Sequence, residues 1–287
     1  MKAAIVYLVR GATEKLERSI KALDRFFNRR FNYPILIFHE EFNKEEKELI
    51  SSWSSSTLEF ILLNDFKKLP NYSGLSVDQV NRWCEGKDGG RKSIGLGYCQ
   101  MCRFFLHTLF VHPRMAEFDY YWRFDDDSYL TSEITYDPFA LMESCKAIYG
   151  YRAVEKENVY ECLGLDLLWK EVKAFAKKEH LSRRYLNRLV ANWKGQYKGF
   201  NYYNNFEINK VSFWREHPGY KKFFQTLDET LGFYKYRWGD ANVRAFSVGL
   251  FLHPKQVHHF GDIGYQHNDH YTALGSDKVI YSRLNLD

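Results

Sequence analysis

The chain has 287 residues, of which 45% are hydrophobic and 27% are charged, an ordinary composition for a globular protein that buries a full core. Its net charge of +5 is mild and shows no basic stripe, so we expect an anionic small ligand and no nucleic-acid partner. No apolar run approaches the roughly 20 residues of a membrane helix, so we expect no membrane span.

The first sixty residues alternate between apolar runs of strand length and helical patterns. Residues 13–27 carry apolar side chains at helical spacing behind Thr13 as the N-cap. Residues 43–53 open with Asn43 and Glu46, a variant of the capping box. Strands are predicted over 3–9, 33–40 and 58–63. This β-α-β-α-β order predicts a parallel sheet that is covered by helices on both faces.

The rest of the chain is less regular. Residues 64–97 are rich in loop-forming residues. Helices are predicted over 98–110, 165–178, 220–231 and 240–252, and strands over 120–124 and 205–214. The sequence shows no repeat, linker or low-complexity segment, so we expect one α/β domain over residues 1–287, built on a mixed and mostly parallel sheet.

Three consecutive acids follow the apolar strand at 120–124. Adjacent carboxylates repel one another, and ligands of open α/β sheets bind beyond the carboxyl ends of strands. If the strand geometry continues, Asp125 and Asp127 point to one side and Asp126 to the other. Two such carboxylates can hold Mn²⁺ or Mg²⁺, which in turn binds a diphosphate. The alternative is a turn capped by Asp side chains, but we expect the metal.

The C-terminal segment VHHFGDIGYQHNDH offers further metal ligands. His258, His259, His267 and His270 fall within it, and histidine is an established ligand of Mn²⁺ and Zn²⁺. Each of them can equally be an ordinary surface or core residue. The preceding segment IGY distinguishes His267 from the others, but the residues alone do not decide which histidine is a ligand.

Two more acids are candidates for chemistry on a sugar. Glu207 lies in the segment YYNNFEI, where Phe206 and Ile208 should point opposite to it. A carboxylate in that setting can stabilise or attack an oxocarbenium ion, although an ordinary strand position is the alternative. Asp240 follows a glycine in RWGDA and can instead be the N-cap of the next helix.

The five cysteines do not predict a metal site. Cys99 and Cys102 form a single CxxC pair without a second pair beside it, which argues against structural zinc. We expect all five, which include Cys84, Cys145 and Cys162, to be small buried apolar residues.

Six segments follow one another in a recognisable order: RFFNRRFNYPILIFHEE, YCQMCRFF, YYWRFDDDSYL with TYDPF, NNFEI, RWGDANV and VHHFGDIGYQH. Together they resemble the fungal α-1,2-mannosyltransferases of glycosyltransferase family 15, the glycolipid 2-α-mannosyltransferase group. The resemblance extends over nearly the whole chain, with DDD where the family has a Glu-Pro-Asp motif.

The resemblance implies a GT-A fold of Rossmann type, a GDP-mannose donor, Mn²⁺ with Mg²⁺ as an alternative, and retention of anomeric configuration. Residues 1–130 are then the nucleotide-sugar half and residues 131–287 the acceptor and catalytic half. The expected metal ligands are Asp125, Asp127 and His267; the expected donor-binding residues are Arg10, Arg103, Arg123, Asp125 and Tyr203; and the expected catalytic residues are Glu207, Tyr98 and Asp240.

The expected reaction is transfer of mannose from GDP-mannose to a hydroxyl group of an oligosaccharide or glycan acceptor in α-1,2 linkage. The alternatives are a carbohydrate-binding protein on a degenerate transferase scaffold, a transferase for another nucleotide-sugar, and a metal-dependent phosphohydrolase. The compartment stays open: the Golgi lumen if a membrane anchor has been removed, and the cytoplasm if the chain is complete.

Overall fold

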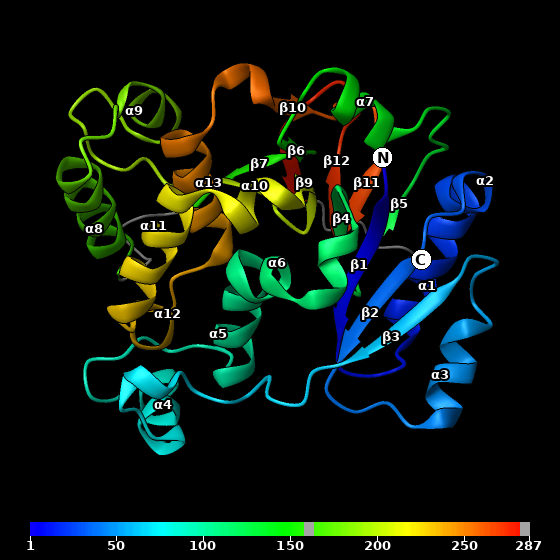
Figure 1. Ribbon diagram of the computed structural model, residues 1–287, viewed down its shortest axis with the longest axis horizontal. Helices are drawn as coiled ribbons and strands as arrows, with labels where there is room; N and C mark the ends of the chain where they lie inside the picture. The colour runs from blue at the N-terminus through cyan, green and yellow to red at the C-terminus, as the bar shows by residue number, and fades with distance from the viewer. Residues whose placement is uncertain (158–163, 282–287) are drawn as a thin grey trace.

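The computed structural model describes residues 1–157 and 164–281, and its centre is a seven-stranded sheet in the order β10-β6-β9-β4-β1-β2-β3 (Figure 1). Among these strands, β9 runs antiparallel to its neighbours β4 and β6, and the other pairs are parallel. The strands are β1 (Ala3–Val9), β2 (Ile35–His39), β3 (Leu58–Leu62), β4 (Tyr120–Phe124), β6 (Tyr149–Tyr151), β9 (Phe206–Lys210) and β10 (Val257–His259). The mixed, mostly parallel sheet that the sequence predicts is confirmed.

A second, antiparallel sheet starts where β4 ends. Its order is β13-β12-β11-β5, and a separate pair joins β7 to β8. These strands are β5 (Ser128–Leu130), β7 (Val154–Lys156), β8 (Phe200–Tyr202), β11 (Tyr265–His267), β12 (His270–Thr272) and β13 (Val279–Tyr281). The second sheet therefore carries His267 and His270 to the carboxyl end of β4.

Strand β1 shows why the main sheet has helices on both faces. Its side chains alternate between two hydrophobic clusters: Ala4 and Val6 belong to one, and Ile5 and Tyr7 to the other. All four are fully buried. Since successive side chains of a strand point to opposite faces, a continuous apolar run needs a cover on each side.

The helices divide between these two faces. One cluster contains apolar residues of α1, η1, α3 and α7, and the other contains residues of η3, α6, α8, α10, α11 and α13. Figure 1 shows α8, α9, α11 and α13 gathered on the side of the molecule away from β3. The first-half helices are α1 (Glu14–Leu23), η1 (Asp24–Asn28), α2 (Arg29–Phe31), α3 (Lys44–Ser51), η2 (Asn71–Ser73), α4 (Val77–Cys84), α5 (Leu96–Arg103), η3 (Phe104–Thr108), α6 (Leu109–Val111) and η4 (Pro113–Glu117). The second-half helices are α7 (Pro138–Ser144), α8 (Leu165–Lys178), α9 (Arg184–Val190), α10 (Val211–Glu216), α11 (Pro218–Glu229), α12 (Gly232–Lys235), α13 (Asp240–Phe251) and η5 (Pro254–Gln256). Within residues 1–157 and 164–281, no helix combines the length and apolar character needed to cross a bilayer.

Several local predictions are confirmed and one is wrong. Thr13 caps α1, and Asn43 and Glu46 form the capping box of α3. Residues 64–97 are mostly loop, as predicted, and the short helices η2 and α4 lie within them. The strand predicted over 205–214 ends at Lys210, because the next residues form α10, whose buried side chains have the three-residue spacing of a helix.

Candidate active site

The three acids lie on a tight turn between β4 and β5, which we call the acid turn (Asp125–Asp127). The turn closes with a hydrogen bond of 3.1 Å from the Ser128 backbone N–H to the Asp125 carbonyl oxygen. The predicted continuation of strand geometry is therefore wrong. Burial, together with the adjacent Asp127 and Asp125 carboxylates, raises the pKa of Asp126 to about 6. The mutual repulsion expected from the sequence is thus present, and the turn favours a cation.

Asp127 and His267 meet at this turn. His267 Nδ1 lies 3.1 Å from Asp127 Oδ1, because β11 pairs with β5 so that His267 stands opposite Ser128. Burial lowers the pKa of His267, although the nearby Asp125 and Asp127 oppose that effect. A neutral imidazole beside a carboxylate is the form that binds a divalent cation. The mostly exposed Lys15 ammonium lies 3.4 Å from the other Asp127 oxygen.

Asp125 is bound to a buried arginine. Arg123 donates from Nε to Asp125 over 2.9 Å, and from a terminal nitrogen to Asp240 over 2.6 Å. Burial disfavours the charge on Arg123, but Asp125, Asp240 and Glu207 raise its pKa well above the usual value. Arg123 is therefore a permanent cation that links the acid turn to the start of α13. The helix begins at Asp240 with Gly239 as its N-cap, so the alternative role of Asp240 as N-cap is wrong.

Tyr203 and Asn204 add aromatic and amide groups to the same place. The Tyr203 ring packs edge-on against His267 at 5.5 Å between centroids, and its hydroxyl lies 3.1 Å from His270 Nδ1. Asn204 donates to Asp240 over 2.7 Å. Of the four C-terminal histidines, His267 and His270 thus lie beside the acid turn.

Ser128 is a residue of this site that sequence reasoning missed. Its fully buried hydroxyl lies 3.2 Å from the Asp125 backbone nitrogen, 2.8 Å from the Tyr265 hydroxyl and 3.4 Å from His267 Nδ1. Tyr265 in turn donates to Asn205 over 2.7 Å. In the sequence, the polar residues of the segments DDDS and YYNN are the only sign of this network, and they do not indicate which side chains bond to one another.

Glu207 lies beneath the site surface. Its side chain is 0% exposed, and its two oxygens accept hydrogen bonds from Tyr121 at 3.0 Å and from Arg244 at 3.2 Å. Strand pairing places Glu207 directly opposite Arg123, so the two side chains leave the same face of the sheet. The catalytic role of Glu207 stays a prediction, with the added constraint that its carboxylate is already part of a buried ion pair.

Tyr98 and Arg10 line a cavity beside the acid turn, which we call the β1 cavity. Its lining consists of Leu8, Val9, Arg10, Glu40, Phe66, Ile94, Gly97, Tyr98 and Met101. The neighbouring Cys102 thiol, burial and the Asp240 carboxylate raise the pKa of Tyr98 far above its usual value, so its hydroxyl stays protonated. Met101 connects this cavity to the acid turn, because its sulfur lies 3.7 Å from the Arg123 guanidinium.

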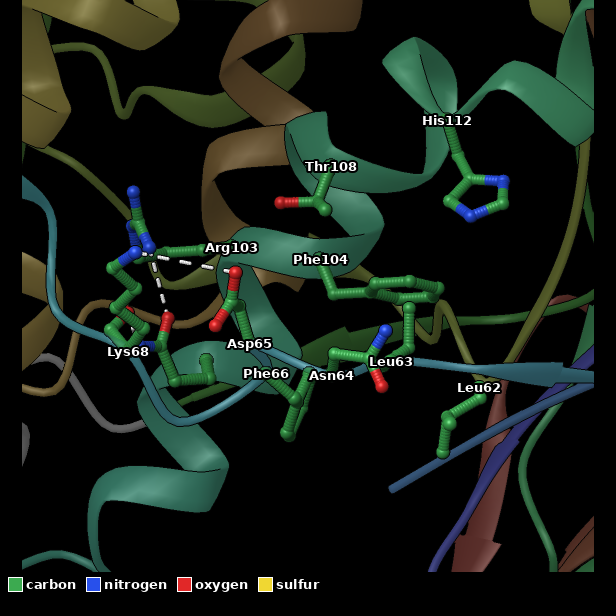
Figure 2. Close-up of a pocket in the computed structure, with 11 residues that line it drawn as sticks. Leu62, Leu63, Asn64, Asp65, Phe66, Lys68, Arg103, Phe104, Thr108 and His112 are labelled. Carbon is green, nitrogen blue, oxygen red and sulfur yellow. Dashed lines mark hydrogen bonds and ion pairs between the residues drawn. The ribbon is translucent and has the colours of Figure 1, made fainter. Parts of the chain in front are cut away.

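Arg103 lies in a different cavity, at the carboxyl end of β3, which Figure 2 shows in close-up. This β3 cavity has a volume of about 330 Å³, and Arg103 and His112 lie at its opposite ends. Two Arg103 nitrogens donate to the two oxygens of Asp228 at 2.7 and 2.8 Å. The donor-binding role of Arg103 stays a prediction, since its charge is already paired.

The other candidates from the sequence lie away from the acid turn. His258 and His259 line a separate surface depression with Tyr136 and Asp262. The thiols of Cys84, Cys99 and Cys102 are buried as expected, but Cys145 is exposed because it ends α7 at the surface. Cys162 lies outside the described residues.

A metal ion at the acid turn would need further ligands from the bound substrate. Within the described parts of the chain, no three His, Cys, Asp or Glu side chains form a set ready to hold an ion. Arg123 holds Asp125, which leaves Asp127 and His267 as the closest pair. Mg²⁺-type sites commonly use one or two carboxylates together with substrate phosphate oxygens, so these residues fit a metal that arrives with a diphosphate.

Comparisons with known proteins identify the family of this chain. Residues 1–285 match the sequence profile of the family described as "Glycolipid 2-alpha-mannosyltransferase". The chain belongs to this family. The Saccharomyces cerevisiae protein "Glycolipid 2-alpha-mannosyltransferase" is 34% identical over 295 residues, which include 100% of this chain and 65% of that protein. The family is one of glycosyltransferase enzymes.

Solved structures of the family share the fold. Core-mannan synthase A from Aspergillus fumigatus, in a Mn/GDP form, aligns with a TM-score of 0.84 and 27% identity over 100% of this chain and 80% of that chain. The mannosyltransferase Ktr4p from S. cerevisiae in complex with GDP aligns with a TM-score of 0.83 and 27% identity, and the alignment covers 100% of this chain and 76% of that chain. The predicted single-domain GT-A fold is confirmed, whereas the division at residue 130 stays a prediction.

Proposed function

We propose that this chain transfers mannose from GDP-mannose to a hydroxyl group of a mannoside or other glycan in α-1,2 linkage, with Mn²⁺ and with retention at the anomeric carbon. One observation carries the proposal. Asp127 and His267 come from distant parts of the chain and meet within 3.1 Å at the carboxyl end of β4. Two similar structures, one titled a Mn/GDP form and one a GDP complex, support the choice of donor and metal.

The chemistry of the acid turn fits Mn²⁺. Carboxylate and neutral imidazole are both good ligands for this ion, and Asp127 and His267 supply one of each. When bound, the ion would act as a Lewis acid that stabilises charge on the departing diphosphate. Mg²⁺ is the alternative ion, but the histidine ligand favours Mn²⁺.

Arg123 orients the acid turn in this proposal. It is a buried cation bonded to Asp125 and Asp240, so it fixes both carboxylates next to the metal pair. Asp240 is held further by Asn204. Tyr203 keeps the His267 imidazole in place by packing against its ring. These side chains set the position of the donor before any bond changes.

Three residues act closest to the sugar. Tyr98, which is protonated and next to Asp240, can donate a hydrogen bond from its hydroxyl to the nucleotide-sugar or to the acceptor sugar. Arg10, beside Tyr98, neutralises phosphate charge. Glu207, opposite Arg123 on the neighbouring strand, supplies negative charge to the anomeric centre. The bond from the anomeric carbon to the diphosphate breaks, the bond to the acceptor oxygen forms, and the acceptor proton leaves with the diphosphate.

Transfer can be measured with a panel of nucleotide-sugars and α-methyl mannoside as acceptor, with and without Mn²⁺. We expect a disaccharide product from GDP-mannose only when Mn²⁺ is present, with an α-1,2 linkage identified by NMR. Binding of sugars without turnover would instead indicate a carbohydrate-binding protein. Cleavage of GDP in the absence of any sugar would indicate a phosphohydrolase, and either result would refute the proposal.

A further inference from the structure

One tryptophan of the chain differs from all the others in its surroundings. Six of the seven tryptophans are buried, with at most 8% of their surface exposed, whereas Trp193 is 89% exposed. A single exposed apolar side chain is ordinary on a protein surface. The support of the Trp193 ring and the charges around it therefore decide whether this residue has a role.

Trp193 lies at the tip of a well-supported turn. The turn follows α9 and closes with a backbone hydrogen bond of 2.8 Å from the Asn192 N–H to the Gln196 carbonyl oxygen. The buried indole of Trp169, on α8, donates to the Gly195 carbonyl oxygen over 3.1 Å. The turn is thus bonded to a core helix while the ring at its tip faces solvent.

The chain around this turn concentrates positive charge. Residues 177–198 contain seven Lys or Arg and one Asp or Glu, a net charge of +6, whereas the whole chain carries +5. The one acid is Glu179, and its carboxylate is already paired at 2.7 Å with Lys222, outside the segment. The mild net charge of the whole chain therefore hides one strongly basic region.

Three of these cations belong to the same part of the surface as the tryptophan. The Lys194 ammonium lies 4.8 Å from the centre of the Trp193 ring. Arg184 and Arg188 are exposed and one helical turn apart on α9, which ends directly before the turn. We call Arg184, Arg188, Trp193 and Lys194 the α9 surface. In Figure 1, α9 lies at the end of the molecule away from β3.

We propose that the α9 surface binds an anionic lipid bilayer, with the Trp193 ring inserted at the interface and the three cations at the lipid headgroups. Tryptophan is enriched at membrane interfaces because its ring is apolar and its N–H is polar. Each Lys or Arg near an anionic membrane strengthens binding by about fivefold. Stable association commonly needs two signals, and the α9 surface combines an apolar ring with a basic cluster.

Single-stranded nucleic acid is the other polyanion that such a surface could bind. Sites for single strands stack successive bases on several aromatic side chains along a groove. The α9 surface has one aromatic ring, Trp193, and that ring projects from the tip of a turn. This shape suits shallow insertion into a bilayer better than stacking along a strand.

Vesicle flotation of the full chain tests the binding, with vesicles of phosphatidylcholine alone or mixed with phosphatidylserine. We expect binding to the mixed vesicles only, and weaker binding as the salt concentration rises, because salt screens exposed charges. The double variant Arg184→Gln with Arg188→Gln should weaken binding by about tenfold to thirtyfold. Trp193→Ser should weaken it by about tenfold, through the loss of apolar contact.

The matched control removes the same charge at the other end of the molecule. Arg25 and Arg30 are exposed, and they lie in η1 and α2, far from α9 in Figure 1. Arg25→Gln with Arg30→Gln should therefore keep the binding of the wild type. A melting curve for each variant shows that it is folded.

Tryptophan fluorescence reports on the inserted ring itself. Because the other six tryptophans are buried, bromine atoms on the lipid acyl chains should quench Trp193 selectively. We expect mixed vesicles made with brominated phosphatidylcholine to lower the emission of the wild type. Trp193→Phe keeps an aromatic ring, so it should retain most of the binding and lose the quenching.

Four results would overturn the proposal. The wild type could fail to bind the mixed vesicles, or it could bind them without quenching, which would place another face on the lipid. Equal losses in the two double variants would indicate attraction by overall charge. Binding to heparin or single-stranded DNA but not to vesicles would assign the α9 surface to a different polyanion. These measurements need neither GDP nor Mn²⁺, so their outcome is independent of the transferase proposal.

Discussion

Asp127 and Glu207 are both carboxylates of the proposed site, yet their surroundings differ. The Asp127 side chain is 14% exposed and faces His267 and the flexible ammonium of Lys15. Glu207 is 0% exposed and paired with the buried guanidinium of Arg244. A carboxylate with solvent access can exchange a lysine for a metal at small cost, since partly exposed ion pairs contribute little.

The buried carboxylate cannot change partners so easily. Removing one member of a buried ion pair leaves the other charge without compensation, which typically costs about 3 to 5 kcal/mol of unfolding free energy. The partly exposed pair Asp127 and His267, which we call the upper layer of the site, is therefore suited to bind and release ligands. The buried pair Glu207 and Arg244, which we call the lower layer, is suited to hold charge in place. Substitutions in the two layers should differ in what they change, binding in the first and stability in the second.

The largest effect is expected for Asp127→Ala. Without this carboxylate, His267 alone cannot hold the metal, and Mn²⁺-dependent binding of GDP should fall below detection in calorimetry. Asp126→Ala is the matched control on the same turn, and it should retain binding because Asp126 has no contact with His267 among the hydrogen bonds of the site. Equal losses in the two variants would contradict the assignment of the metal pair.

Glu207→Gln should be next in size. If Glu207 supplies charge to the anomeric centre, kcat should fall by about two to four powers of ten while GDP affinity is kept. The same variant leaves the Arg244 cation unpaired, so its melting temperature should fall too. A loss of activity alone therefore does not distinguish a catalytic role of Glu207 from a structural one.

A double variant separates these two effects. Glu207→Gln with Arg244→Met removes both buried charges, and stability should recover at least in part, since a neutral pair of similar volume is often tolerated. Continued loss of kcat in this stable protein supports a role at the sugar. Recovery of kcat along with stability would show that Glu207 serves the fold.

The contrast between the layers also shows what the sequence can predict. Strands β1, β2 and β4 are visible as apolar runs, because burial on both faces requires nearly every side chain to be apolar. The acid turn is visible as a cluster of like charges that needs an explanation. The prediction of its geometry is wrong, because the choice between a continuing strand and a turn depends on contacts of the Ser128 hydroxyl. This hydroxyl bonds to the Tyr265 hydroxyl on β11 and to the backbone N–H of Asp125.

Partners between distant segments could not be predicted. Nothing in the segment NFEI indicates that Glu207 pairs with Arg244, or that Arg123 joins Asp240 to Asp125. These contacts depend on the order of strands in the sheet and on where α13 packs. The resemblance to a known family supplied His267, which residue chemistry alone left among four similar histidines.

His267→Ala sharpens the upper layer further. We expect the apparent affinity for Mn²⁺ to fall by about tenfold to a hundredfold, with less effect on melting temperature, because Asp127 keeps its carboxylate for the ion. The matched control is His258→Ala, in the separate depression near Asp262. Titration of Mn²⁺ in the presence of GDP measures both, and greater sensitivity at His258 would show that the histidine is misassigned.

The smallest effect is expected for Gly97→Ala, which tests how the site holds Arg10. A methyl group at residue 97 would lie 1.9 Å from an Arg10 nitrogen, so the arginine must move away from residue 97. Its guanidinium is the free end of a flexible side chain, and the fold should accept this change. Alanine is also favoured over glycine within a helix by up to about 1 kcal/mol, so the melting temperature should stay the same or rise.

Affinity for GDP should change in the opposite direction, falling by about three- to tenfold, the amount expected for one hydrogen bond. Gly11→Ala is the matched control, because a methyl group there meets nothing within 4 Å. Arg10→Ala should reproduce the loss, and combining it with Gly97→Ala should add nothing, since both act through one side chain. Additive losses would mean that residue 97 changes the affinity for GDP without acting through Arg10. Unchanged affinity in Gly97→Ala would show that Arg10 does not bind the donor.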